Sequence, residues 1–173
     1  MSRTEIKIGG FGGQGVILTG LVLGKAAALH GGKNATMIQS FGPEARGSAC
    51  SSQLVVADEE ILYPYVRRPK ILVVMSREAY SKFIPELAPD GVLLYEEDLV
   101  DIDDKVAERT ALGVPATRIA EDLGNRIVIN MVMLGFFTAV SELLDEEAVQ
   151  EAIRSSVPRG TEQLNLMAFG RGF

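Results

Sequence analysis

The residues best suited to chemistry form a glycine-rich run near the start of the chain, with the sequence GGFGGQG at positions 9–15. Gly10, Gly12 and Gly15 fit the pattern G-x-G-x-x-G between an expected strand and an expected helix. Glycines let the backbone approach a phosphate closely, and the free N–H groups at a helix N-terminus favour an anion. The candidate cofactor-binding residues are therefore Gly10, Gly12, Gly13, Gln14 and Gly15. A tight turn that packs on a neighbouring segment explains the same glycines equally well.

The sequence around this run argues against two common nucleotide chemistries. A dinucleotide site needs an acidic residue roughly 20 positions further on to hold the ribose. Positions 33–42 contain no carboxylate, although Gln39 or Ser40 could donate a hydrogen bond there. A P-loop is also absent, because Gly24-Lys25 is followed by Ala26 inside an expected helix. NAD chemistry and hydrolysis of a nucleoside triphosphate are thus disfavoured.

A second unusual stretch, GPEARG at positions 42–47, follows the expected second strand. Its glycines bracket a turn, its proline stiffens that turn, and its arginine could bind a phosphate or carboxylate through two hydrogen bonds. The carboxyl ends of strands are also where open α/β sheets bind ligands. The candidate residues for a partner contact or a substrate path are Gly42, Pro43, Glu44, Arg46 and Gly47. The alternative is a local ion pair between Glu44 and Arg46 that fixes a surface loop.

The scarcity of cysteine and histidine limits the metal chemistry of this chain. Cys50 is the only cysteine and His30 the only histidine. One cysteine forms no internal disulfide and supplies neither a cysteine-only zinc site nor an iron–sulfur cluster. We therefore expect no metal site and no cofactor held by this chain alone, and no side chain is assigned a catalytic role.

The elements that would position these motifs alternate between strand and helix. Strands are expected at 5–8, 36–39, 48–57, 71–75 and 91–95. Helices are expected at 16–30, 78–87, 115–123, 131–140 and 145–155, with a last helix around Leu164 and Met167. Asn130 is expected to cap the helix at 131–140, and the acidic stretch 96–104 to be solvated. Such alternation predicts an α/β fold, a single Rossmann-like domain over residues 1–173 with a mainly parallel sheet flanked by helices.

Composition restricts the partners and the compartment. The chain has 173 residues and a net charge of −6, which argues against a nucleic-acid partner. No segment approaches the roughly 20 apolar residues of a membrane span, and the N-terminus lacks the features of a signal peptide. We therefore expect no membrane contact and a cytoplasmic protein. The mean hydropathy of +0.17 predicts that some apolar surface faces another polypeptide, so the isolated chain is expected to homodimerise.

Taken together, GGFGGQG, GPEARG and the pair Asn130-Met131 resemble the gamma subunit of the 2-oxoacid:ferredoxin oxidoreductases, and the likeness extends over most of the chain. Enzymes of this family convert a 2-oxoacid, coenzyme A and oxidised ferredoxin to an acyl-CoA, CO2 and reduced ferredoxin. The resemblance implies thiamine diphosphate, Mg²⁺ and iron–sulfur clusters held by other subunits. It also implies alpha, beta and possibly delta subunits as partners, with ferredoxin reached through the complex.

The resemblance further implies a non-catalytic role in assembly and in the path of coenzyme A. The glycine run would then meet a pyrophosphate or a partner's backbone, and Arg46 a charged group at the subunit junction. The main alternative is a stand-alone module that binds a nucleotide or a phosphate-bearing metabolite. A stand-alone nucleotide-dependent reductase is a further alternative, although no ribose partner or hydride-delivery site is evident in the sequence.

Overall fold

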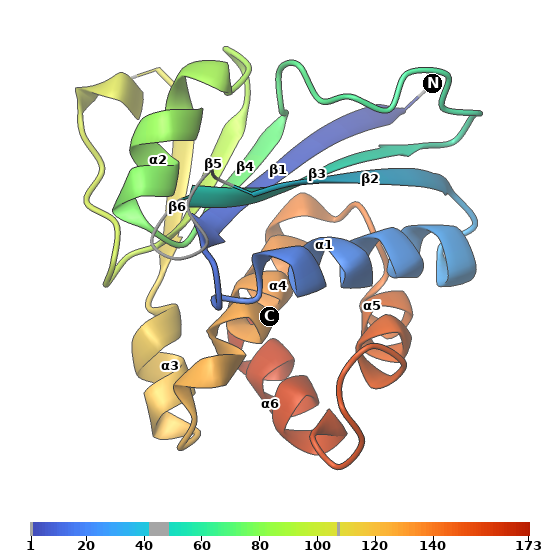
Figure 1. Cartoon of the computed structure of the whole chain (residues 1–173), viewed down its shortest axis with the longest axis vertical. Helices are drawn as coiled ribbons and strands as arrows, with labels where there is room; N and C mark the ends of the chain where they lie inside the picture. The colour runs from blue at the N-terminus through green and yellow to red at the C-terminus, as the bar shows by residue number, and fades with distance from the viewer. Residues whose placement is uncertain (1, 42–48, 107) are drawn as a thin grey trace.

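A six-stranded sheet forms the centre of the molecule, and every strand except β3 runs in the same direction (Figure 1). The structure is a computed structural model that describes residues 2–41, 49–106 and 108–173. The strands are β1 Arg3–Phe11, β2 Asn34–Ser40, β3 Ala49–Ala57, β4 Ile71–Val74, β5 Val92–Glu96 and β6 Thr110–Val114. The helices are α1 Val16–Lys25, α2 Arg77–Phe83, α3 Ala116–Asp122, α4 Ile129–Ser141, α5 Glu146–Arg154 and α6 Glu162–Gly172.

The strand order β2-β3-β1-β4-β5-β6 explains how a mostly parallel sheet contains one reversed strand. After α1 the chain crosses to the edge of the sheet as β2 and returns as β3, which pairs antiparallel with both β2 and β1. The remaining pairs, β1 with β4, β4 with β5 and β5 with β6, are parallel. The expected α/β fold with a mainly parallel sheet is confirmed.

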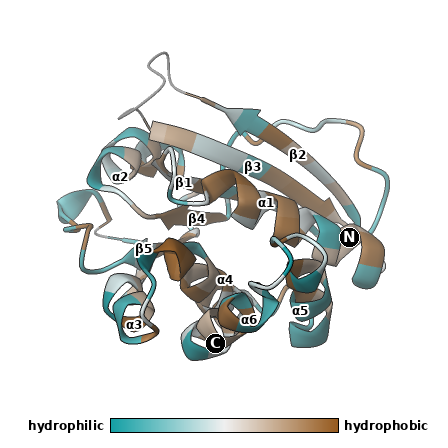
Figure 2. Ribbon diagram, turned by 60° about the horizontal axis from the view of Figure 1, so that its bottom comes forward, coloured by the Kyte–Doolittle hydropathy of each residue, from teal (hydrophilic) through white to brown (hydrophobic). Residues whose placement is uncertain are grey.

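The helices cover the two faces of the sheet unequally. Helices α1, α3, α4, α5 and α6 lie on one face, and α2 lies on the other (Figure 1). The sheet has an apolar core on each face, and strand β4 contributes side chains to both. Ile71 and Val73 point to the larger helical layer, whereas Leu72 and Val74 point to α2. Figure 2 shows apolar residues along the sheet and along α1 and α4, as a layered core requires. No helix in the described ranges is both long and apolar enough to cross a membrane.

Several boundaries differ from the expectations. The helix expected at 16–30 is present, but its last turn widens into a π-helix, Ala26–His30, before Gly31 ends it. The expectation that Asn130 caps the following helix is wrong: α4 begins at Ile129, directly after a 3-10 turn at Arg126–Val128. Strand β6 was not expected at all. It is a short edge strand interrupted by a glycine, with a weak pattern of burial.

The acidic stretch 96–104 is not uniformly solvated, contrary to expectation. Glu96, the last residue of β5, is fully buried. Its Oε1 accepts a hydrogen bond from the backbone N–H of Thr117 at 2.9 Å, while Oε2 has no partner among the described residues. Burial raises the pKa of this carboxyl group, because desolvation disfavours its charged form. Glu96 thus fixes the junction between β5 and α3.

Candidate functional site

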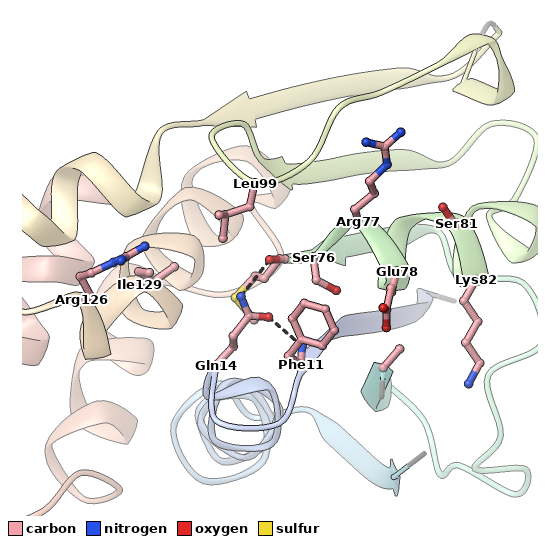
Figure 3. A pocket seen from close by; sticks show the side chains of 12 residues that line it. Phe11, Gln14, Ser76, Arg77, Glu78, Ser81, Lys82, Leu99, Arg126 and Ile129 are labelled. Carbon is pink, nitrogen blue, oxygen red and sulfur yellow. Dashed lines mark hydrogen bonds between the residues drawn. The ribbon is translucent and has the colours of Figure 1, made fainter. Parts of the chain in front are cut away.

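The glycine run connects the end of β1 to the start of α1 and is held in place by one of its own side chains. The Gln14 Oε1 accepts a hydrogen bond from the backbone N–H of Phe11 at 2.7 Å, and its Nε2 donates to the carbonyl of Met75 at 2.9 Å (Figure 3). Met75 directly follows β4, so Gln14 ties the loop to the neighbouring parallel strand. The Gln14 side chain therefore positions the loop, and its polar atoms are already engaged within the chain.

Two of the glycines are required for packing inside the chain. A Cβ atom on Gly10 would lie 2.7 Å from Gln14 Oε1 and 2.9 Å from a methyl group of Val16. Gly15 has a φ of 76° and would place a Cβ atom within the side chain of Asn130. Both positions exclude a larger residue whether or not a ligand binds. For these residues, the tight-turn interpretation of the glycine pattern is sufficient.

Gly12 and Gly13 have a different environment, because they are exposed and a Cβ atom on either would meet nothing within 4 Å. They precede the N-terminus of α1, whose cap residue Gly15 offers no side chain to its free N–H groups. Backbone here can therefore be approached closely from outside. These two glycines are the part of the expected motif that remains available to a phosphate or to a partner's backbone.

A cavity of about 1140 Å³ lies against one side of the loop and is bordered by Phe11 and Gln14. Three cations and one carboxylate line it: Arg77, Glu78 and Lys82 from α2, and Arg126 from the 3-10 turn before α4. Figure 3 shows Arg126 on one side of the glycine loop, with Arg77 and Lys82 on the other. Their partners are weak or exposed, with Arg77 3.8 Å from Asp101 and Arg126 3.3 Å from Glu121. In a chain of net charge −6, this local group of cations favours an anion.

A second cavity of about 550 Å³ opens on the other side of the loop, above the first turn of α1. Gly12, Gly13 and Gly15 line it, together with apolar side chains from the first turn of α1, the 3-10 turn before α4 and the segment 157–164. Asn130 lines it too and donates from Nδ2 to the carbonyl of Gly15 at 3.5 Å. Burial raises the pKa of the Cys50 thiol, which borders the same cavity. That thiol is therefore held in its neutral, unreactive form.

The second motif cannot be placed in this site. Gly42, Pro43, Glu44, Arg46 and Gly47 lie outside the described residues. The described residues on either side border the two cavities: Ala49 lines the first, and Phe41 lines the second. Ala49 is also paired with Phe11 at the end of β1. The role expected for these five residues remains a prediction.

Sequence reasoning missed four residues of the site: Asn130 in its observed role, and the cations Arg77, Lys82 and Arg126. A signal for Arg77 was available, because Ser76-Arg77 comes one residue after the buried strand β4, and ligands gather at the carboxyl ends of such strands. Ser76 itself is engaged, since its Oγ accepts a hydrogen bond from Ala79 N at 3.1 Å and caps α2. Arg126 had no such signal, because it reaches the cavity from a distant part of the chain.

The residues present do not fit the metal-containing groups expected elsewhere in such enzymes. The single cysteine cannot supply an iron–sulfur cluster. The described residues contain no group of three histidine, cysteine, aspartate or glutamate side chains that could hold a metal ion.

The fold and the site together define an α/β domain with a glycine loop between β1 and α1, which borders two cavities, and no metal centre among the described residues. Residues 5–173 match the family model described as pyruvate ferredoxin/flavodoxin oxidoreductase. The chain belongs to this family, as a member of the gamma-subunit type.

Three relatives show how far the similarity extends. The chain is 48% identical to the 2-oxoglutarate synthase subunit KorC of Methanocaldococcus jannaschii, over 99% of this chain and 92% of that one. It is 32% identical to the pyruvate synthase subunit PorC of Methanothermobacter marburgensis, over 89% of this chain and 86% of the relative. The solved gamma subunit of a keto/oxoacid ferredoxin oxidoreductase from Geobacter sulfurreducens is 33% identical, with a TM-score of 0.85 over 98% of this chain and 96% of that chain.

Proposed function

We propose that this chain is the gamma subunit of a 2-oxoglutarate:ferredoxin oxidoreductase. The observation that carries this proposal is the difference between its relatives: identity is 48% to a 2-oxoglutarate synthase subunit and 32% to a pyruvate synthase subunit. The first similarity covers almost the full length of both chains. The reaction would convert 2-oxoglutarate, coenzyme A and oxidised ferredoxin to succinyl-CoA, CO2 and reduced ferredoxin.

The chemistry of bond breaking would belong to sister subunits of the alpha, beta and delta types. Thiamine diphosphate supplies the electron sink for decarboxylation in such enzymes. The single cysteine cannot supply the clusters that carry the electrons away, and the described residues contain no group of three histidine, cysteine, aspartate or glutamate side chains that could hold a metal ion. The contribution of this chain would be to assembly and to the binding of coenzyme A.

The glycine-loop edge supports a role in the path of coenzyme A. Coenzyme A carries a pyrophosphate and a further phosphate, so it needs cations and free N–H donors at a closely approachable backbone. Gly12 and Gly13 provide such a backbone at the smaller cavity. Arg77, Lys82 and Arg126 provide the cations around the larger cavity, which borders the same loop at Phe11 and Gln14. That cavity slightly exceeds the usual range of ligand pockets, about 300–1,000 Å³.

The identity of the complex can be tested with a tagged chain purified anaerobically from its native host. Co-purifying subunits would be identified by mass, and the eluate would be assayed for oxoacid-dependent dye reduction with 2-oxoglutarate, pyruvate and a branched-chain 2-oxoacid. We expect larger subunits to co-purify and kcat/KM for 2-oxoglutarate to exceed the others by at least about tenfold. A preference for another oxoacid would overturn the assigned substrate. A chain that elutes alone and inactive would overturn the assignment as a subunit and favour a stand-alone phosphate-binding module.

The coenzyme A path can be tested at Gly12, where a side chain would extend into open space and the chain's own packing would not change. We expect Gly12→Leu to raise the KM for coenzyme A by about tenfold while the complex still assembles. Gly170→Leu is the matched control, because Gly170 is an exposed residue of α6 whose Cβ atom would also meet nothing within 4 Å. An unchanged KM in the assembled Gly12→Leu complex would contradict a coenzyme path at this loop.

A further inference from the structure

A second surface, rich in basic and aromatic side chains, lies at the opposite end of strand β1 from the glycine loop. It is formed by the start of β1, the start of β4 and the connection between β3 and β4. We define the basic–aromatic patch as Arg3, Tyr63, Tyr65, Arg67, Arg68 and Lys70. Strand β1 separates the two surfaces, since it runs from Arg3 at one to Phe11 at the other. At about 3.3 Å per residue, they lie about 26 Å apart.

The patch is organised around one carboxylate whose hydrogen-bonding capacity is largely used by the chain. Glu5 Oε2 accepts hydrogen bonds from the backbone N–H groups of Arg67 at 3.0 Å and Arg68 at 3.1 Å. Glu5 Oε1 accepts one from Arg3 at 3.1 Å. The two backbone bonds fix the loop without using the guanidinium groups of Arg67 and Arg68. These charged groups are therefore presented outward from an anchored backbone.

The charges of the patch are only partly neutralised by the chain itself. Arg3, Arg67, Arg68 and Lys70 surround Glu5 in a shallow hollow of about 350 Å³. Lys70 pairs with Asp90, and both side chains are exposed. Arg68 makes no ion pair within the described ranges. Glu59 and Glu60 precede the patch on the same connection but do not line the hollow. A concentration of cations on a chain of net charge −6 selects an acidic partner.

Aromatic side chains beside the cations extend the patch beyond a simple anion site. The rings of Tyr63 and Tyr65 are 5.4 Å apart, and the Arg67 guanidinium lies 4.9 Å from the Tyr63 ring centre. Arg67 also donates to the Tyr63 hydroxyl at 3.2 Å. Tyr65 is nevertheless 54% exposed, and the adjacent Leu62 is 85% exposed. Exposed, pre-ordered tyrosine and arginine are the residue types that dominate the energetics of protein–protein interfaces.

We propose that the basic–aromatic patch docks an acidic surface of a sister subunit of the oxidoreductase, an inference that rests on the proposed function. The partner would supply carboxylates to Arg67 and Arg68 and an apolar side chain to Tyr65. A protein fits better than a small anion, because the hollow is shallow and the exposed tyrosines would stay uncovered by phosphate. A second copy of this chain fits less well: the acidic stretch 97–104 follows the carboxyl end of β5, at the other end of the sheet from this patch. A head-to-tail contact between the two would build a ring or an open filament rather than a simple dimer.

The test uses the complete complex with the double variant Arg67→Glu, Arg68→Glu. Its control is Arg154→Glu, Arg171→Glu, which makes the same change in net charge on exposed positions of α5 and α6. We expect the patch variant to raise the dissociation constant of this subunit from the complex at least about tenfold, while the control changes it little. Wild-type dissociation should also increase with salt concentration, because the charge pairs are screened. Sedimentation velocity at several salt concentrations measures both quantities.

The outcomes separate this proposal from the proposed function. A wild-type chain that recovers no oxidoreductase subunits refutes the function itself. A wild-type complex that assembles normally, with the patch variant equal to the control, refutes only the docking surface. Self-association of the wild-type chain that the patch variant abolishes would assign the patch to a second copy and overturn the proposal. Binding of inorganic phosphate by the isolated chain, lost in the patch variant while assembly is unchanged, would also overturn it. Thermal unfolding of the isolated variants verifies that each one folds.

Discussion

At the scale of single residues, two amide side chains give the glycine loop its shape. Gln14 connects the loop to β1 and to the residue after β4 with bonds of 2.7 and 2.9 Å. Asn130 reaches from α4 to the carbonyl of Gly15. Each amide joins segments that are distant in the chain, so the loop is ordered before any ligand arrives. Such preorganisation lowers the entropic cost of binding.

Glu96 gives a prediction at the same scale. Burial raises its pKa in the folded protein, so its contribution to stability is fully present below the pKa of the unfolded chain. That contribution is lost as the pH rises through the higher folded pKa. Glu96→Gln keeps the oxygen that accepts from Thr117 and removes the charge. We therefore expect the variant and the wild type to be similarly stable near pH 4, and the variant to be more stable at pH 8 by about 1.4 kcal/mol for each unit of pKa shift.

Urea unfolding across this pH range measures the difference between the two proteins. Glu59→Gln is the control, because it removes the same charge from an exposed position. A constant difference between wild type and Glu96→Gln at all pH values would contradict the ionisation of a buried carboxyl group.

At the scale of elements, glycines allow helices to approach closely. Gly20 brings α1 onto β3, where a Cβ atom would overlap the buried Ser52 hydroxyl. Gly135 and Gly172 do the same between α4 and α6, where a Cβ atom would meet the carbonyls of Phe169 and Val132 respectively. In this contact between α4 and α6 the backbones meet directly, so rotation of a side chain cannot relieve a clash there.

Gly135→Ala should consequently destabilise the fold, although alanine is the better helix former. We expect a loss of about 2 kcal/mol or more in the free energy of unfolding, because α6 must shift to admit the methyl group. Gly170→Ala in α6 has open space and should be neutral or stabilising by up to about 1 kcal/mol. Chemical denaturation of both variants checks this, and equal stability of the two would contradict close contact between α4 and α6.

The elements also show what sequence can predict and why. The apolar run of β4 and the glycine-bounded helix α1 were predictable, because local pattern and capping determine them. Strand β6 was not, because Gly113 interrupts its apolar pattern, and the sequence does not show that a side chain there would clash with the Tyr95 ring of the neighbouring strand. The sequence predicts that Asn130 caps a helix, because it cannot show that the Asn130 side chain lies beside the carbonyl of Gly15. The burial of Glu96 could not be predicted either, because its carboxylate accepts a hydrogen bond from the backbone N–H of Thr117 in the next helix.

At the scale of the whole molecule, apolar residues are exposed beside the glycine loop. Phe41 is 69% exposed and Ile127 is 72% exposed, and both border the smaller cavity. Exposed apolar groups of this kind are typical of surfaces that are covered in an assembly. The expected homodimer of the isolated chain would use this face.

We therefore predict that the isolated chain self-associates reversibly and that Ile127→Lys raises the dissociation constant at least about tenfold, which is about 1.4 kcal/mol. Leu29→Lys is the control, because Leu29 is equally exposed at the end of the π-helix, away from both cavities. Sedimentation velocity over a range of concentrations gives the constants. A wild-type chain that stays monomeric throughout would contradict the prediction.

The central position of β1 also has a consequence for the timing of folding. Of the six strands in the sheet, β1 is synthesised first, yet Ile6 pairs with Leu54 on one side and with Ile71 on the other. Its hydrogen bonds therefore remain unmade until those later residues have left the ribosome, several seconds after β1 at about 5–20 residues per second. Pairing over such long sequence separations also slows folding in the complete chain. The first strand to be synthesised thus depends on the middle of the chain for its stability.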